Sequence, residues 1–129
     1  MSRRAYNNLS REVIACAIEV HKALGPGLLE RVYEDALEYE MKNQGLQVLR
    51  QVSIDVKYKE LKINNGYFAD LIVNDMLILE LKAVENVLPV HKAQLLSYLK
   101  LADKKLGLLL NFHVNKMTEG VNRVINGRL

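Results

Sequence analysis

The segment 70–82, which reads DLIVNDMLILELK, constrains the fold of this chain more than any other feature. It holds two short apolar runs separated only by an Asn-Asp pair, and such runs are typical of strands buried on both faces. Asp70, Glu80 and Lys82 nevertheless place charges at the ends of these strands. A buried charge is costly unless it is paired or bound to a metal ion. The segment therefore predicts two central strands with a polar site at one end.

The position of Asp70 relative to Glu80 and Lys82 depends on the loop between the two strands. Glu80 and Lys82 are two residues apart and share one face of a strand. A two-residue loop would set Asp70 opposite Leu79, with its side chain on the other face. A three-residue loop, or a bulge near Asp70, would set it opposite Glu80, and we expect one of these two devices. Two carboxylates and a lysine suggest a site for a hard divalent cation and an anionic substrate. A structural ion pair between Glu80 and Lys82 also fits.

Hydrophobic periodicity predicts the other elements, because apolar residues recur every three or four positions in some segments and alternate in others. We expect one domain over residues 1–129, with 1–8 flexible, and an α/β (α+β) fold with a mixed central β-sheet flanked by helices. The expected helices are 9–24, 26–43, 89–103 and 115–126. The expected strands are 46–58, 67–73, 76–84 and 106–112, with turns at 59–60 and 64–66 and a short strand between these turns.

Composition narrows the classes of function. The single cysteine excludes an intrachain disulfide and a Cys-rich zinc site. No apolar run reaches membrane-spanning length and the first residues contain no apolar signal region, so we expect no membrane partner and a cytoplasmic location. The net charge of +3 permits a polyanionic partner without demanding one. The chain shows no evident DNA-recognition module or strong basic stripe, which counts against sequence-specific cleavage by this domain alone.

An ordered set of motifs runs along nearly the whole chain. The set consists of GLLERVY at 27–33, Asp70, Glu80-x-Lys82, Gln94-xxx-Tyr98 and LLLNF at 108–112. This order resembles the GxxExxY family, a small branch of the PD-(D/E)XK nuclease superfamily, and implies a restriction-endonuclease-like core. Ala69 stands where the superfamily name has proline, a position that varies widely.

The resemblance implies Mg²⁺-dependent hydrolysis of phosphodiester bonds in DNA or RNA, with Mn²⁺ as a substitute. Oxygen ligands of this kind suit Mg²⁺, which typically takes one or two carboxylates plus waters and phosphate oxygens. The implied metal ligands are Asp70, Glu80, the main-chain carbonyl of Leu81, and Glu30. Lys82 would orient and help deprotonate the attacking water. The implied substrate contacts are Gln94 and Tyr98, which would hold the substrate backbone, and Tyr33, which would hydrogen-bond a site carboxylate.

Alternative interpretations of these residues stay open. Glu30 also fits a solvated helix residue, and Gln94 and Tyr98 fit the boundary of an amphipathic helix, where a tyrosine keeps its polar end in water. In place of an enzyme, the chain also fits a catalytically silent nucleic-acid-binding or regulatory module that keeps the nuclease fold. A second copy of the chain, in a homodimer, is a further candidate partner.

Overall fold

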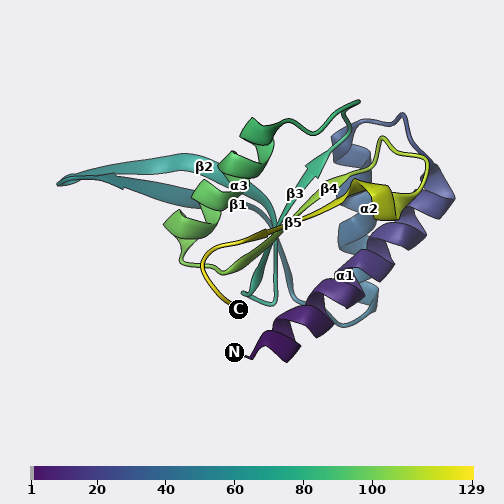
Figure 1. Ribbon diagram of the computed structural model, residues 1–129, viewed down its shortest axis with the longest axis horizontal. Helices are drawn as coiled ribbons and strands as arrows, with labels where there is room; N and C mark the ends of the chain where they lie inside the picture. Colours follow the sequence, from purple (N-terminus) through teal and green to yellow (C-terminus); the bar gives the residue numbers. More distant parts are fainter. Residues whose placement is uncertain (1) are drawn as a thin grey trace.

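The sheet has helices on both faces, which confirms the predicted mixed sheet flanked by helices. This computed structural model describes residues 2–129. Two long helices cover one face of the sheet and a third covers the other (Figure 1). The elements in chain order are α1 (Arg3–Leu24), α2 (Glu30–Asn43), β1 (Val48–Tyr58), β2 (Leu61–Val73), β3 (Leu77–Lys82), α3 (Pro89–Ala102), β4 (Leu106–Asn111), the 3₁₀ helix η1 (Met117–Gly120) and β5 (Val121–Ile125).

The strands lie in the order β1-β2-β3-β4-β5, and only the pair β3–β4 is parallel. Alternation along β3 divides its side chains between two cores. Leu79 and Leu81 belong to the core under α1 and α2. Ile78 belongs to the core under α3. Glu80 and Lys82, which alternate with Leu79 and Leu81, therefore lie on the α3 face.

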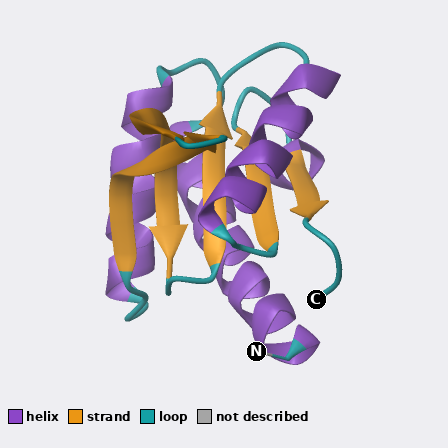
Figure 2. Cartoon of the chain, turned by 90° about the vertical axis from the view of Figure 1, so that its left-hand side faces the viewer, coloured by secondary structure: helices purple, strands orange, loops and turns teal. Residues whose placement is uncertain are grey.

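Beyond the sheet, β1 and β2 continue as a two-stranded extension, here called the arm and comprising residues 55–66. The arm projects away from the body of the protein on the left of Figure 1 and points toward the viewer in Figure 2. The pairing register shifts between Ile54 and Val56, so β2 contains extra residues at the base of the arm. The shift bends the ribbon where it leaves the sheet.

The predicted turn at 64–66 is wrong, because these residues lie within β2. Asn65 has the positive φ of a turn residue, 55°. Its N–H, however, donates to Oδ1 of Asp55 at 3.0 Å, and its side chain meets the Ser53 hydroxyl. These cross-strand bonds hold it as a bulge. The chain reverses at 59–60, as the sequence predicts.

The predicted helix at 115–126 is also wrong. The segment forms η1 and then β5, which pairs antiparallel with β4. Val121, Val124 and Ile125 have spacing that fits a helix, but three apolar residues within a five-residue segment do not distinguish a helix from a strand. Without β5, the backbone groups along this edge of β4 would lack these partners, and pairing satisfies them.

Two helix starts differ from the prediction. Helix α1 begins at Arg3, so residues 3–8, expected to be loose, form its first turns, and the Ser2 side chain accepts from the N–H of Ala5. Helix α2 begins at Glu30 rather than at Pro26, because Gly27 has a φ of 101° that no helix accepts. Within residues 2–129, no helix is both long enough and apolar enough to cross a membrane.

Candidate active site

The hairpin between β2 and β3 has a three-residue loop, 74–76, which confirms the first of the two expected devices. Leu71 pairs with Leu79 across this hairpin. The register therefore brings Asp70 level with Glu80 rather than with Leu79. A loop one residue shorter would have moved the Asp70 side chain to the other face.

The Asp70 and Glu80 side chains each accept a backbone N–H of the neighbouring strand where the β2–β3 ladder ends. The N–H of Leu81 donates to Oδ2 of Asp70 at 2.8 Å. In return, the N–H of Asp70 donates to Oε1 of Glu80 at 3.2 Å. These two side-chain bonds continue the pairing beyond the last backbone pair, so the fold holds the carboxyl groups side by side.

Burying the ionised form of Glu80 lowers the stability of the fold. Its side chain lies on the α3 face and is only 8% exposed. Burial, with the nearby Asp70 carboxylate as the second cause, raises the pKa of Glu80 to about 9, although Lys82 partly opposes this. Burial also raises the pKa of Tyr98, and the charges of Glu80 and Asp70 add to the shift. A cation bound between the carboxylates would offset both burial and repulsion.

Gln51 connects this pair to helix α2. The β1–β2 ladder skips Gln51 and Asp70, and Gln51 has a φ of 51°, which is rare for a residue within a strand. In this conformation its Nε2 donates to Oδ1 of Asp70 at 3.3 Å and to Oε1 of Glu34 at 2.8 Å. Strained backbone of this kind is common beside functional sites. Gln51 therefore links a carboxylate on α2 to the cluster.

Glu34, the carboxylate at the other end of this link, is buried and paired. Its Oε2 accepts from Nη2 of Arg50 at 3.0 Å. Arg50 also contacts Asp35 and Glu38 on the same helix, so its guanidinium group is fixed by three carboxylates. The sequence does not distinguish Glu34 from Glu30. The reason is that residues four apart lie on one helix face, and the spacing does not say which is buried.

The structure corrects the predicted position of Glu30. Glu30 is the exposed first residue of α2, and within residues 2–129 it makes no hydrogen bond or ion pair. Because α2 begins there rather than at Pro26, the residue that reaches the site lies one helical turn later, at Glu34.

The expected hydrogen bond from Tyr33 to a site carboxylate is wrong as well. The Tyr33 hydroxyl donates to the carbonyl of Gly25 at 2.6 Å and accepts from the N–H of Leu28 at 3.1 Å. Its ring is fully buried and stacks on Phe112, with centroids 4.5 Å apart. Tyr33 thus fixes the turn between α1 and α2.

Lys82 shares the face of Glu80, as predicted, and is half-buried. The chain after it is fixed by the buried Asn111, whose Oδ1 accepts from the N–H of Val84 at 3.1 Å. The Nδ2 of Asn111 donates to the carbonyl of Val84 at 2.8 Å. The end of β3 that carries Lys82 is therefore held by two bonds from β4.

Gln94 and Tyr98 lie on α3, over the same face of the sheet. Gln94 is exposed, and Tyr98 is half-buried, with its ring centroid 4.9 Å from that of Tyr67 on β2. Tyr98 lies on the same face of the sheet as Glu80, and the Glu80 charge contributes to the raised pKa of its hydroxyl. Tyr67 is a site neighbour that the sequence analysis missed, because nothing in an alternating strand marks one tyrosine above another.

The donor atoms of this site suit a hard divalent cation. Asp70, Glu80 and the main-chain carbonyl of Leu81 supply only oxygen, which Mg²⁺ and Mn²⁺ prefer. Within residues 2–129, no three His, Cys, Asp or Glu side chains come together as a metal cluster. A cation here would thus keep several positions for water and substrate oxygens, as Mg²⁺ sites commonly do. The proton that Glu80 carries at neutral pH would be displaced on binding.

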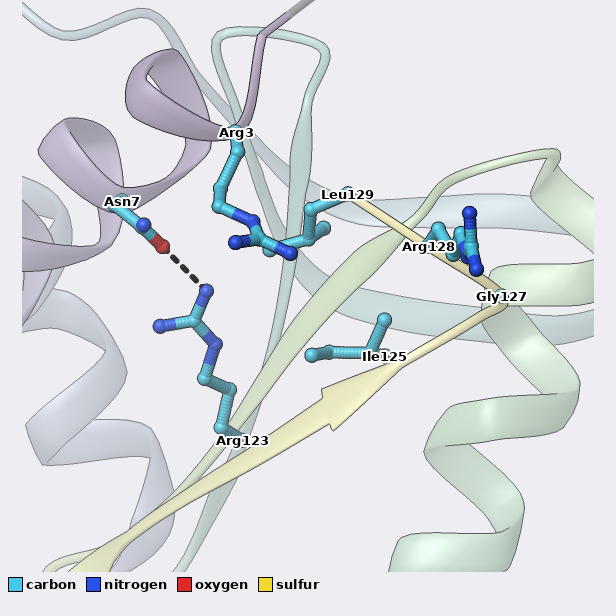
Figure 3. Close-up of a pocket in the computed structure, with 7 residues that line it drawn as sticks. All are labelled: Arg3, Asn7, Arg123, Ile125, Gly127, Arg128 and Leu129. Carbon is cyan, nitrogen blue, oxygen red and sulfur yellow. Dashed lines mark hydrogen bonds between the residues drawn. The ribbon is translucent and has the colours of Figure 1, made fainter.

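A cavity of about 740 Å³ lies elsewhere. It is bounded by the first turns of α1, by β5 and by the residues after it, and Figure 3 shows Arg3, Arg123 and Arg128 around it. Nη2 of Arg123 donates to the side chain of Asn7 at 2.5 Å. Three of the seven residues that line the cavity are arginines and none has a carboxylate side chain, so its charge disfavours a cation.

Comparison with known proteins identifies the class to which this fold and site belong. The profile of the PD-(D/E)XK nuclease superfamily matches residues 7–124, and the chain belongs to this superfamily. Nucleases of this superfamily act on nucleic acid and generally use divalent metals. No curated protein and no solved structure matches the chain.

Proposed function

We propose that this protein hydrolyses phosphodiester bonds of DNA or RNA with Mg²⁺, and that it belongs to the GxxExxY branch of the superfamily. The observation that carries the proposal is the pair of hydrogen bonds that joins Asp70 to Glu80 and Leu81, with Lys82 on the same face of β3 as Glu80. A fold that needed only stability would not keep a buried carboxyl group against a second carboxylate.

Each residue of the cluster has a part in this proposal. Asp70, Glu80 and the carbonyl of Leu81 would hold the metal ion. Gln51 and Glu34 would act as positioning residues, since the Gln51 amide donates to Asp70 and to Glu34. Outer hydrogen bonds of this kind orient metal ligands and raise their affinity.

When bound, Mg²⁺ would polarise the scissile phosphate and favour ionisation of the attacking water. Lys82 would donate a hydrogen bond to that water or to the phosphate, and its charge would stabilise the developing negative charge. Asn111 would keep Lys82 in register by holding Val84. Tyr98 and Gln94, on α3, would contact the substrate next to the scissile bond.

Calorimetric titration with Mn²⁺ tests the metal site. We expect wild type to bind one ion and Asp70→Ala to lose that binding. Asp75→Ala is the matched control, because Asp75 lies in the same hairpin and its side chain is 85% exposed. Equal affinity in wild type and Asp70→Ala would remove the site. Cleavage of single-stranded, duplex and branched DNA and RNA, with Mg²⁺ and with EDTA, then tests hydrolysis.

We also propose that the protein forms a homodimer through the arm. Tyr58 pairs with Leu61, and Val56 pairs with Ile63, so these four side chains share one face. Tyr58 and Leu61 are 60% and 59% exposed. Apolar groups gathered on an exposed face commonly mark an interface. Light scattering should show a dimer for wild type and a monomer for Leu61→Lys. A monomeric wild type would contradict this part of the proposal.

A further inference from the structure

A shallow groove lies between the base of the arm and α3, on the face that carries Glu80 and Lys82. Its volume is about 180 Å³, and it is lined by Tyr67, Val90, Ala93, Gln94, Ser97 and Tyr98. Two rings make up one end of it, since the centroids of Tyr67 and Tyr98 are 4.9 Å apart with planes tilted by 49°. Tyr67 remains 41% exposed despite this contact, so part of its ring is free for another partner.

The chemistry of the groove suits a nucleobase better than a phosphate. None of its six residues carries a charge, so it offers no cation to a phosphate group. The rings provide a surface on which a base can stack, and such stacking is tolerant of sequence because every base has a π face. The Gln94 amide can both donate and accept along a base edge. The volume is well below the roughly 300–1,000 Å³ of pockets for drug-sized ligands, which limits the occupant to about one ring system.

The groove lies on the same face of the sheet as the carboxylates. Tyr67 is three residues before Asp70 on β2, on the side of the sheet where its pairing partner Ile54 joins the core under α3. Tyr98 contacts the Tyr67 ring from α3, which packs on the sheet face that carries Glu80. A nucleotide whose phosphate lies at the carboxylates would therefore have its neighbouring base within reach of the two rings.

We infer that Tyr67 and Tyr98 form a stacking platform for an unpaired base, and that the site selects single-stranded or frayed nucleic acid. This inference rests on the proposed nuclease function and adds its substrate class. In a duplex both faces of each base are already stacked and the pairing edges are occupied. Only an unpaired base can offer the groove a free face and a free edge. Tyr67 is thus a specificity-determining residue.

Binding of oligonucleotides that carry 2-aminopurine, measured in EDTA so that no cleavage occurs, tests this inference. Stacking on an aromatic ring should quench the fluorescence of this base in the wild-type complex. Tyr67→Leu, which keeps apolar bulk but removes the ring, should weaken binding of single-stranded DNA and RNA by about tenfold and abolish the quenching. Tyr67→Phe should bind like wild type. Duplexes should bind wild type and Tyr67→Leu with equal affinity. Comparing DNA with RNA oligonucleotides shows which sugar the site prefers.

Tyr39→Leu is the matched control, because Tyr39 lies on α2 across the sheet and is 65% exposed. The inference is overturned if Tyr67→Leu retains wild-type affinity for single strands, if duplex affinity falls equally, or if wild type causes no quenching. The wild-type quenching needs no substitution, so the test survives a poorly folded variant. Parallel cleavage with Mg²⁺ separates the two proposals. If wild type cleaves nucleic acid but shows none of these effects, only the platform is refuted. If wild type neither binds nor cleaves nucleic acid, both proposals are refuted.

Discussion

Replacing Glu80 by Gln should stabilise the metal-free protein at neutral pH. The carboxyl group is nearly buried beside Asp70, and its pKa is raised from 4.5 to about 9. Between these values the folded protein holds a proton that the unfolded chain releases. The free energy of unfolding of wild type must therefore fall as the pH rises through this window. Glutamine does not titrate, so the variant should not show this fall.

The size of the effect follows from the distance between the working pH and the ordinary pKa. At pH 7 the unfolded carboxyl is about 2.5 units above its pKa, and each unit corresponds to about 1.36 kcal/mol. Wild type should thus lose about 3 kcal/mol between pH 4.5 and pH 7 that Glu80→Gln keeps.

Urea denaturation in EDTA, followed by circular dichroism at several pH values, measures this difference. Glu60→Gln at the exposed tip of the arm controls for the loss of a surface charge. We expect the gap between Glu80→Gln and wild type to widen with pH, and Glu60→Gln to follow wild type. Added Mg²⁺ should then stabilise wild type and leave Glu80→Gln almost unchanged, because ligand binding to the folded state alone raises stability. Parallel pH profiles for wild type and Glu80→Gln would refute this account of the carboxyl pair.

Four further substitutions test other parts of the structure. Gly120→Ala should destabilise the fold by about 3 kcal/mol, because its Cβ would lie 1.9 Å from the carbonyl oxygen of Asn111. A wild-type melting temperature would contradict this contact. Tyr33→Phe should cost about 1–3 kcal/mol in thermal unfolding but leave Mn²⁺ affinity intact, and weaker metal binding would contradict its structural role. Calorimetry should show Mn²⁺ affinity reduced about tenfold in Glu34→Gln and unchanged in Glu30→Gln, whereas the reverse order would restore Glu30 to the site.

The central strands and their charged residues could be predicted from the sequence because the loop length of a hairpin fixes which residues lie opposite each other. Once Asp70 and Glu80 had to share a face, only a three-residue loop or a bulge satisfied the alternation, and the loop is what the structure has. The long helices could also be predicted, since their apolar periodicity extends over several turns.

The wrong predictions concern segments whose structure is decided by contacts with residues far away in the chain. The Asn-Asn-Gly sequence at 64–66 is a strong turn signal, but cross-strand bonds from Asp55 and Ser53 make it a bulge. The terminal segment 121–125 is a strand only because β4 offers a free edge. Contacts of this kind join residues distant in the chain, and no local pattern encodes them.

Glu34 and Gln51 could not be predicted as site residues for the same reason. Glu30 and Glu34 occupy one helix face, and only the actual start of α2 decides which is buried. Gln51 is one of several polar residues in an alternating strand, and its positive φ cannot be read from its identity. Its role became visible only through its bonds to Glu34 and Asp70.

The most direct test of the account is the rate at which Lys82→Ala cleaves labelled oligonucleotides in Mg²⁺. Lys92→Ala, an exposed lysine on α3, is the matched control. Wild type and Lys92→Ala should cleave. Lys82→Ala should be slower by at least about a hundredfold while still binding Mn²⁺, because Lys82 acts on the water and the phosphate rather than on the metal. Full activity in Lys82→Ala would contradict the mechanism. A wild type that binds Mn²⁺ and nucleic acid but cleaves no substrate would instead establish the catalytically silent binding module.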